Sequence, residues 1–402
     1  MSIAKNKNLN KLYLFVIFFV MYEFSTYASN DMIMPGMLDV VREFHASIQC
    51  VGLSLTVFIL GNSLLQLFLG PLSERYGKRR VILIGNFSFL IFTFFLVMST
   101  NITMFMLGRL LQGSGIAFIA MGYALIHENF NDKEAIKICA LMGNVSILAP
   151  LLGPILGVFI IQMSQWRYVF SITGLIASIA FIGLYLFTPQ TSNEKLIKLP
   201  LHKIGKQYLT ILLTKQFIMG TLCISLATLP VLCWIGLSAT IIMQTLKHSM
   251  ISYAFYQCLA IGGITLSTVV IHIVAGKINF YHLIIIGMLI AFSGLITSLI
   301  FHNSLNIATV GMFIYSFGLG ILNAMIIRLV MTLPNLPHSL LTSLMVFIQT
   351  SIFAIGLEIT NHICHYFNYS LYSFTLINFV IGCCFVVLIP IYAKMNKNRE
   401  WK

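Results

Sequence analysis

Residues 12–38, LYLFVIFFVMYEFSTYASNDMIMPGML, form a run that is long and apolar enough to predict a membrane-spanning helix. A helix needs about 20 mostly apolar residues to cross the hydrocarbon core of a bilayer. The run also carries two acids, Glu23 and Asp31, which are costly to expose to lipid. We therefore expect a helix with one face toward protein or water.

The composition of the whole chain supports the same fold class. Of 402 residues, 58% are hydrophobic and 9% are charged, whereas soluble proteins carry about 25% charged residues. This composition excludes a soluble enzyme or transcription factor and a disordered chain. The eight cysteines contain no CxxC pair, so they predict no metal or redox site and are interpreted as packing residues.

Eleven further apolar runs follow the first, which predicts an all-α integral membrane protein with six spans on each side of a central loop. The expected domains are an N-terminal bundle at 1–188, a cytoplasmic loop at 189–216 and a C-terminal bundle at 217–402. The loop fits an interfacial helix or a solvated linker equally well. The later spans are 51–69, 81–98, 102–126, 136–163, 169–187, 217–243, 251–275, 283–300, 305–333, 340–363 and 371–392.

The basic residues predict that both termini are cytoplasmic. With this orientation, only Arg42, Arg167 and Lys247 of the 24 lysines and arginines lie in outer segments, while Arg109 and Arg328 lie within spans. The net charge of +13 is then a topology signal and a contact for anionic lipid, so no nucleic-acid partner is expected.

The first span has a polar stripe made of Glu23, Tyr27, Asn30 and Asp31, which fall within an arc of roughly 100° on a helix. Arg109 and Asp31 are each seven residues from the outer ends of their spans, which places both about 10 Å below the surface and makes them candidate partners. We hypothesise that Glu23 and Asp31 exchange protons as the access to a cavity changes.

Two further charged residues, Glu358 and Arg328, lie in the second half of the chain. They fit cavity residues, a structural pair or side chains that reach toward the membrane surface, and the sequence does not decide between these interpretations.

Three segments resemble motifs of the major facilitator superfamily, which implies two six-helix bundles. They are GPLSERYGKRR at 70–80, RLLQG at 109–113 and APLLGPILG at 149–157. The third is typical of efflux members. The resemblance assigns conformational roles to Gly70, Glu74, Arg75, Gly77, Arg79, Gly153, Pro154 and Gly157. Glu74 replaces the usual aspartate, and Val158 replaces a usual glycine.

YEFSTY at 22–27 and NDMIMPGML at 30–38 are similar to the first helix of the bacterial multidrug–proton antiporters of this superfamily. The resemblance implies that Glu23 and Asp31 recognise substrate and protons and that Arg109 couples to Asp31. It also implies a drug pocket that touches Tyr27, Asn30, Met142 and Ser146. Glu358, in a segment similar to the same family, is a further candidate for substrate binding.

The expected function is secondary active efflux of lipophilic cationic and neutral drugs in exchange for protons, by a monomer of the bacterial inner membrane. The proton gradient would supply the energy, without cofactor, metal or ATP. One alternative is a proton-coupled uptake symporter of the same fold. A membrane-embedded enzyme is the other, but HExxH, GxSxG and Walker A motifs are missing from the sequence.

Overall fold

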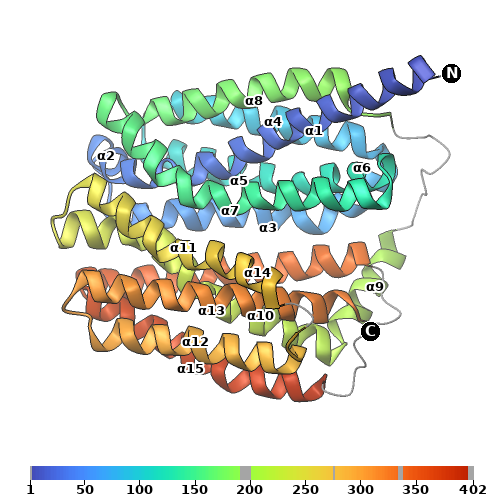
Figure 1. Ribbon diagram of the computed structural model, residues 1–402. Helices are drawn as coiled ribbons and strands as arrows, with labels where there is room; N and C mark the ends of the chain where they lie inside the picture. The colour runs from blue at the N-terminus through green and yellow to red at the C-terminus, as the bar shows by residue number, and fades with distance from the viewer. Residues whose placement is uncertain (1, 191–200, 275–276, 334–337, 397–402) are drawn as a thin grey trace. The chain divides into compact units, whose positions relative to one another are not determined.

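A computed structural model describes residues 2–190, 201–274, 277–333 and 338–396 (Figure 1). These residues form helices and no strands, and twelve helical spans are long and apolar enough to cross a membrane. The predicted all-α membrane fold class is confirmed. The α-helices are α1 Ser2–Asp31, α2 Met37–Glu43, α3 Cys50–Tyr76, α4 Lys78–Val97, α5 Ile102–Ala117, α6 Ile119–Asn129, α7 Asp132–Met163, α8 Arg167–Phe187, α9 Leu201–Leu212, α10 Lys215–Ala239, α11 Met250–Val274, α12 Phe280–Ile300, α13 Leu305–Met331, α14 His338–Tyr366 and α15 Leu371–Met395.

The chain divides into two compact units. Unit 1 contains Met1–Ala46 and Val57–Ile204, and unit 2 contains Ser47–Thr56 and Gly205–Lys402. The first turns of α3 therefore belong with the second half of the chain. The division after Ile204 falls within the segment 189–216 and inside the short helix α9.

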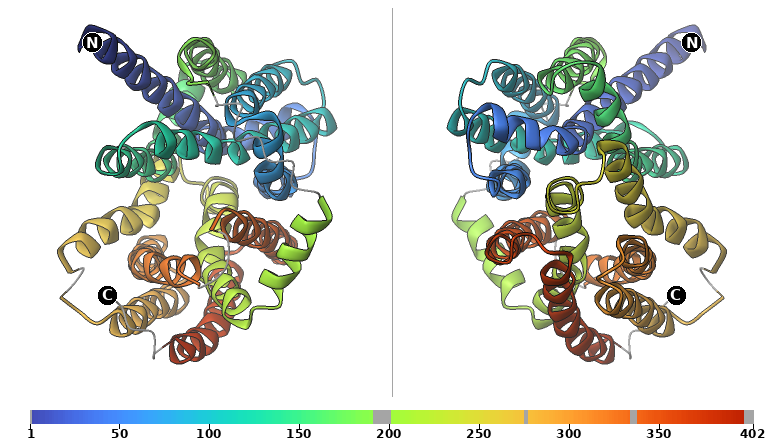
Figure 2. Two further views of the ribbon diagram at one scale, coloured as in Figure 1. Left: turned by 90° about the vertical axis from the view of Figure 1, so that its right-hand side faces the viewer. Right: turned by 90° about the vertical axis from the view of Figure 1, so that its left-hand side faces the viewer.

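Unit 1 is built around α1, which packs against α7 and α8, while α4 packs against α5 and α8. In Figure 2, α4 and α8 are seen nearly end-on, and the N-terminal part of α1 is inclined to them. Large aromatic side chains fill the core between them, and Phe15, Phe19 and Phe89 are completely buried. This packing fixes the position of the α1 stripe relative to α5, α6 and α7.

Short polar residues begin several of these helices. The side chain of Asn101 accepts a hydrogen bond from the backbone N–H of Met104, and that of Asn131 accepts one from Glu134. Each contact satisfies one of the amides that a helix leaves unpaired at its start. These two caps set where α5 and α7 begin.

Three spans depart from regular α-helix. The first span ends its α-helix at Asp31 and continues through a 3₁₀ turn, Met34–Gly36, into α2. Pro35 in this turn has no backbone N–H to donate to the helix. The sequence did not predict that the fourth span divides at Phe118 or that α10 continues as a π-helix over Thr240–Thr245. By contrast, α7 runs unbroken through Pro150 and Pro154.

In unit 2, α12 and α13 form an extensive and close helix contact. A Cβ atom on Gly294 would lie 2.3 Å from the backbone nitrogen of Tyr315, and one on Gly318 would lie 2.3 Å from that of Ala291. Such spacing leaves no room for a side chain, so the two backbones meet directly. Around this pair, α10 packs against α13, α14 and α15.

Candidate functional site

The polar stripe of α1 is buried inside unit 1. Glu23 is 1% exposed, Asp31 is 5% exposed and Asn30 is 8% exposed. Side chains of this kind are stable inside a membrane protein only when protein groups or a water-filled cavity replace bulk water. The surroundings of each acid therefore determine what the stripe can bind.

Asn30 connects the buried Arg109 to Asp31. The guanidinium Nη2 donates to Oδ1 of Asn30 over 2.5 Å, and Nδ2 of Asn30 donates to Oδ1 of Asp31 over 3.2 Å. An arginine can only donate hydrogen bonds and an ionised carboxylate can only accept them. An amide between them satisfies both, so a change in the charge of Asp31 is transmitted to Arg109 through one side chain.

Arg109 is held from two further directions. Its Nη1 donates to Oε1 of Gln112 over 2.8 Å, and Nε2 of Gln112 donates to the hydroxyl of Thr93 over 3.0 Å. The ring of Phe58 lies 4.3 Å from Cζ of Arg109, a cation–π contact. These contacts fix a fully buried cation in one orientation.

The glycines of the fifth-span motif bring α7 against α1 at the level of Asp31. A Cβ atom on Gly153 would lie 2.6 Å from Cβ of Asp31, and one on Gly157 would lie 2.0 Å from the carbonyl oxygen of Met32. Pro154 is buried beside them. The motif thus gives a close backbone contact next to the acid.

Glu23 lies two turns from Asp31 along α1 and has a different partner. The hydroxyl of Tyr123, in α6, donates to its Oε1 over 2.9 Å. Its Oε2 is buried, and within the described parts of the chain no group hydrogen-bonds to it. A carboxyl group with one oxygen unsatisfied is suited to bind a proton or a cationic ligand.

The remaining residues of the expected pocket lie in α1 and α7. Tyr27 is half-buried and Met142 is completely buried. The hydroxyl of Ser146 donates to the carbonyl of Gly143 in its own helix over 2.8 Å. The structure thus brings Asn30, Asp31 and Arg109 into one network, and it assigns Glu23 to a second contact.

Glu358 and Arg328 belong to unit 2 and have separate surroundings. Thr56 donates to Oε2 of the half-buried Glu358 over 3.2 Å. Arg328 is exposed near the end of α13, where its Cζ lies 5.9 Å from the ring of Phe280. Arg328 thus follows the pattern of a side chain that reaches toward the membrane surface.

The GPLSERYGKRR motif forms a tight connection between α3 and α4. Gly77 has a φ of 84°, a conformation that favours glycine. Lys78 pairs with Glu128 at the end of α6, and Arg79 donates to the carbonyl of Tyr185 at the end of α8 over 2.8 Å. The motif therefore joins three helix ends of unit 1.

The other members of that motif make fewer contacts with the core. Arg75 is exposed, with its Cζ 5.3 Å from the ring of Tyr76. Glu74 is half-buried, and a Cβ atom on Gly70 would meet no heavy atom within 4 Å. Packing within unit 1 therefore does not require glycine at position 70.

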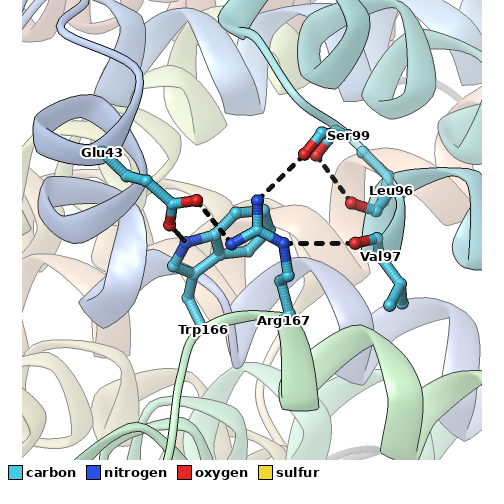
Figure 3. Close-up of polar contacts among 6 residues, drawn as sticks. All are labelled: Glu43, Leu96, Val97, Ser99, Trp166 and Arg167. Carbon is cyan, nitrogen blue, oxygen red and sulfur yellow. Dashed lines mark hydrogen bonds and ion pairs between the residues drawn. The ribbon is translucent and has the colours of Figure 1, made fainter.

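A second polar cluster lies at the opposite end of unit 1, around Arg167 (Figure 3). Its guanidinium is 2.6 Å from Oε1 of Glu43 and donates to the carbonyls of Val97 and Ser99 over 3.2 and 2.9 Å. The indole of Trp166 donates to the other oxygen of Glu43 over 2.7 Å. These contacts attach the end of α2 to α4 and α8.

Sequence reasoning missed several of these residues. Tyr123, Thr93 and Phe58 each sit in an apolar run as a single polar or aromatic residue, which is common in packed helices. The sequence predicts Arg167 only as a basic residue of an outer segment and gives no role to Glu43. Their partners are distant in sequence, so no spacing in one helix could have identified them.

A family model described as Major Facilitator Superfamily matches residues 19–360. A protein named multidrug transporter MdfA from Escherichia coli O6:H1 is 36% identical over 389 residues, which cover 95% of this chain and 94% of that protein. The MdfA of Yersinia pestis bv. Antiqua is 33% identical over the same shares of the two chains.

Two solved structures share the fold. A D-xylose-proton symporter has a TM-score of 0.70 at 15% identity and covers 93% of this chain and 97% of its own. A bacterial homologue of the human lysosomal transporter Spinster, in an inward-facing and unoccupied conformation, has a TM-score of 0.70 at 14% identity and covers 97% of both chains. At these identities, the likeness concerns the fold alone.

Proposed function

Because the chain belongs to the major facilitator superfamily, and is thus a multi-pass membrane transporter, we propose that it is a multidrug efflux antiporter. It would exchange protons for lipophilic cationic and neutral drugs across the bacterial inner membrane, with both termini in the cytoplasm. The relatives named multidrug transporter MdfA, which match 95% of the chain, support the substrate class.

The observation that carries the proposal is the buried connection from Asp31 through Asn30 to Arg109. A proton that binds Asp31 neutralises the carboxylate and weakens its hydrogen bond from Asn30, because hydrogen bonds to charged groups are the stronger ones. Asn30 then holds Arg109 less firmly. Proton binding is thus linked to the packing of α1 against α5 within unit 1, through which a proton can bias the conformation of that unit.

Drug binding competes with the proton at the same acids. A lipophilic cation is attracted to an ionised Glu23 or Asp31, whereas a neutral drug is bound by apolar and aromatic side chains near them, such as the half-buried Tyr27. Glu358, half-buried in unit 2, is proposed as a separate candidate acid for cationic drugs. The carboxylates are ionised when they bind a cationic drug. They are protonated when the transporter returns without drug to the conformation that binds it.

The proton gradient can supply the energy without a bound cofactor or ATP. One charge that crosses the membrane down a potential of about 100 mV yields about 2.3 kcal/mol. At about 1.4 kcal/mol per tenfold concentration ratio, this supports a gradient of roughly 40-fold. A monomer suffices, because each chain contains the complete set of proposed coupling residues.

Everted membrane vesicles test the proposal, with an energised membrane and tetraphenylphosphonium, a lipophilic cation. Efflux predicts uncoupler-sensitive accumulation of the cation inside the vesicles, and it predicts that Asp31→Asn abolishes this accumulation. The variant Asp39→Asn is the control, since Asp39 is a half-buried acid of α2 that pairs with the exposed Arg42. Proton-driven loss of a nutrient from the vesicles would favour an uptake symporter instead.

A further inference from the structure

The ring of Phe58, in α3, contacts Arg109 in the interior of unit 1. Cζ of Arg109 lies over this ring, 4.3 Å from its centre, and the side chains of Phe58 and Arg109 are 2% and 0% exposed. The face of an aromatic ring attracts a cation, and the attraction is strongest where water is excluded. Phe58 therefore stabilises the charged guanidinium although it is not an acid.

The backbones of α3 and α5 touch at the level of this contact. A Cβ atom on Gly113 would lie 1.9 Å from the carbonyl oxygen of Phe58, and one on Gly61 would lie 1.8 Å from that of Leu110. Gly61 is one turn from Phe58 along α3, and Gly113 is one turn from Arg109 along α5. A side chain at either glycine would push the two helices apart, so both glycines are needed to bring the ring to the cation.

Arg109 and Asp31 meet through Asn30 rather than directly. Among the described residues no ion pair joins Arg109 to Asp31, whereas Arg109 donates to Asn30 over 2.5 Å and Asn30 donates to Asp31 over 3.2 Å. Opposite charges attract strongly inside a protein, and arginine readily makes two hydrogen bonds to one carboxylate. To do so here, the guanidinium has to leave its present position. The contacts that hold it in place therefore oppose a direct ion pair.

Phe58 differs from the other two contacts of the guanidinium. Asn30 is also bonded to Asp31, so its hold on Arg109 depends on the charge of that acid. Gln112 belongs to the same helix as Arg109, one turn away. Phe58 is on a third helix and has no proton to gain or lose. Its contact can therefore hold the guanidinium in both charge states of Asp31.

Arg109 is the cation that the packing of unit 1 brings to the network of Asp31. On the stripe itself, Glu23 and Tyr27 lie two turns and one turn before Asp31. At its contact with the acid, α7 presents Gly153. The described titratable groups of α6 and α8 that bond to the first span are Tyr123, which donates to Glu23, and Arg167, which pairs with Glu43.

We propose that Phe58 is a positioning residue that keeps Arg109 from direct contact with Asp31 and so keeps this acid able to bind a proton. The inference rests on the proposed antiport, in which Asp31 is protonated in one step and ionised in another. A direct pair with arginine stabilises the ionised form of an acid. With a weaker hold by the ring, the pair forms and Asp31 takes up its proton only at lower pH. Phe58 thus sets the pH range in which the exchange operates.

Fluorinated phenylalanines at position 58 test the proposal with little change in the shape of the side chain. Each fluorine atom withdraws electrons from the ring and weakens the negative face that attracts a cation. The purified protein in lipid nanodiscs is titrated with acid, and the infrared band of a protonated carboxyl group, identified by its loss in Asp31→Asn, reports the protonation of Asp31. The midpoint should fall with each added fluorine, by about one pH unit for three, since an arginine beside an aspartate lowers such a midpoint by about one to three units.

Two substitutions and a control accompany the series. Phe58→Leu removes the ring and should lower the midpoint at least as far as three fluorine atoms do, whereas Phe58→Tyr keeps the ring face and should restore the wild-type midpoint. The control has the same fluorinated residues at Phe105 of α5, which is completely buried and meets the rings of Trp166 and Phe170 edge-on at 5.5 and 6.0 Å. It should titrate like the wild type. A midpoint that stays constant or rises across the Phe58 series would overturn the proposal.

Tetraphenylphosphonium separates this inference from the proposed antiport. Added to the wild-type protein at a pH at which Asp31 is protonated, the cation should displace the proton and remove the infrared band. A band that persists with the cation bound would refute the competition between drug and proton. Displacement in the wild type, together with a constant midpoint in the Phe58 series, would refute only the role of Phe58.

Discussion

Gly153 and Asp31 touch so closely that a Cβ atom on the glycine would lie 2.6 Å from Cβ of the acid. Real Cβ atoms essentially never approach other atoms to less than 3.0 Å. The fifth-span motif is therefore a steric requirement at the acid, and its first glycine fixes how near α7 can come to the proposed proton site.

Gly153→Ala and Gly157→Ala should each separate α7 from α1 and strongly reduce drug resistance in a host without its own efflux pumps. Overpacking a tight contact costs about 1–3 kcal/mol, so the melting temperature should fall as well. Gly143→Ala is the control in the same helix, because its Cβ atom would meet nothing within 4 Å. Equal resistance in all three variants would show that close contact at Asp31 is unnecessary.

Asn30→Ala should uncouple transport from protons, since it removes the amide that joins Arg109 to Asp31. Drug-induced proton release should fall about tenfold or more, and the loss of a partner for a buried charge should cost about 3–5 kcal/mol of stability.

Asn361→Ala is the matched control for this variant. Asn361 is a buried asparagine of unit 2 that donates to the carbonyl of Gln49 and accepts from Tyr369, so it bridges neutral groups. We expect it to lower the melting temperature without changing the number of protons released per drug bound. Normal coupling in Asn30→Ala would contradict the proposed role of the amide.

Gly77→Ala should destabilise the protein by about 1–3 kcal/mol, because a side chain at a φ of 84° is strained. The strain acts where Lys78 and Arg79 attach α4 to the ends of α6 and α8. Thermal unfolding in detergent measures the loss. Gly70→Ala, in the same motif but in open space, should unfold at the wild-type temperature.

Arg167→Gln should lower the free energy of unfolding by about 1–3 kcal/mol, since it removes the charged partner of the exposed Glu43 and leaves the carbonyls of Val97 and Ser99 without their donor. Arg42→Gln is the control at the same end, where the side chain of Arg42 is 67% exposed. Surface pairs contribute about 0–1 kcal/mol. Chemical denaturation of both variants gives the comparison, and equal losses would mean that the cluster in Figure 3 adds nothing beyond a surface pair.

The fold class could be predicted from the sequence because a membrane helix is marked by its own composition. Residues 12–38 identify a span without reference to any other part of the chain. Glu23 and Asp31 could be identified for the same reason, since an acid in an apolar run is conspicuous. The break after Asp31 follows from Pro35, which acts locally.

The remaining features depend on which helices meet. The sequence suggested that Arg109 and Asp31 are partners from their equal depth, but it gave no sign that Asn30 lies between them. Tyr123 is 100 residues from Glu23, and its role follows only from the packing of α6 near α1. The π-helix at Thr240–Thr245 likewise contains no proline or glycine from which a departure from α-helix could have been predicted.

The interlocked backbones of α12 and α13 have a consequence for how the protein is made. Lipid chains solvate an apolar helix as well as a neighbouring helix does, so apolar surface alone does not hold two membrane helices together. Here Gly294 and Gly318 supply direct main-chain contact, and only the short connection from Phe301 to Ser304 separates the two helices. The two helices can therefore pack against each other in the bilayer while the ribosome is still synthesising the last two spans. Those spans can then pack against a helix pair that is already formed.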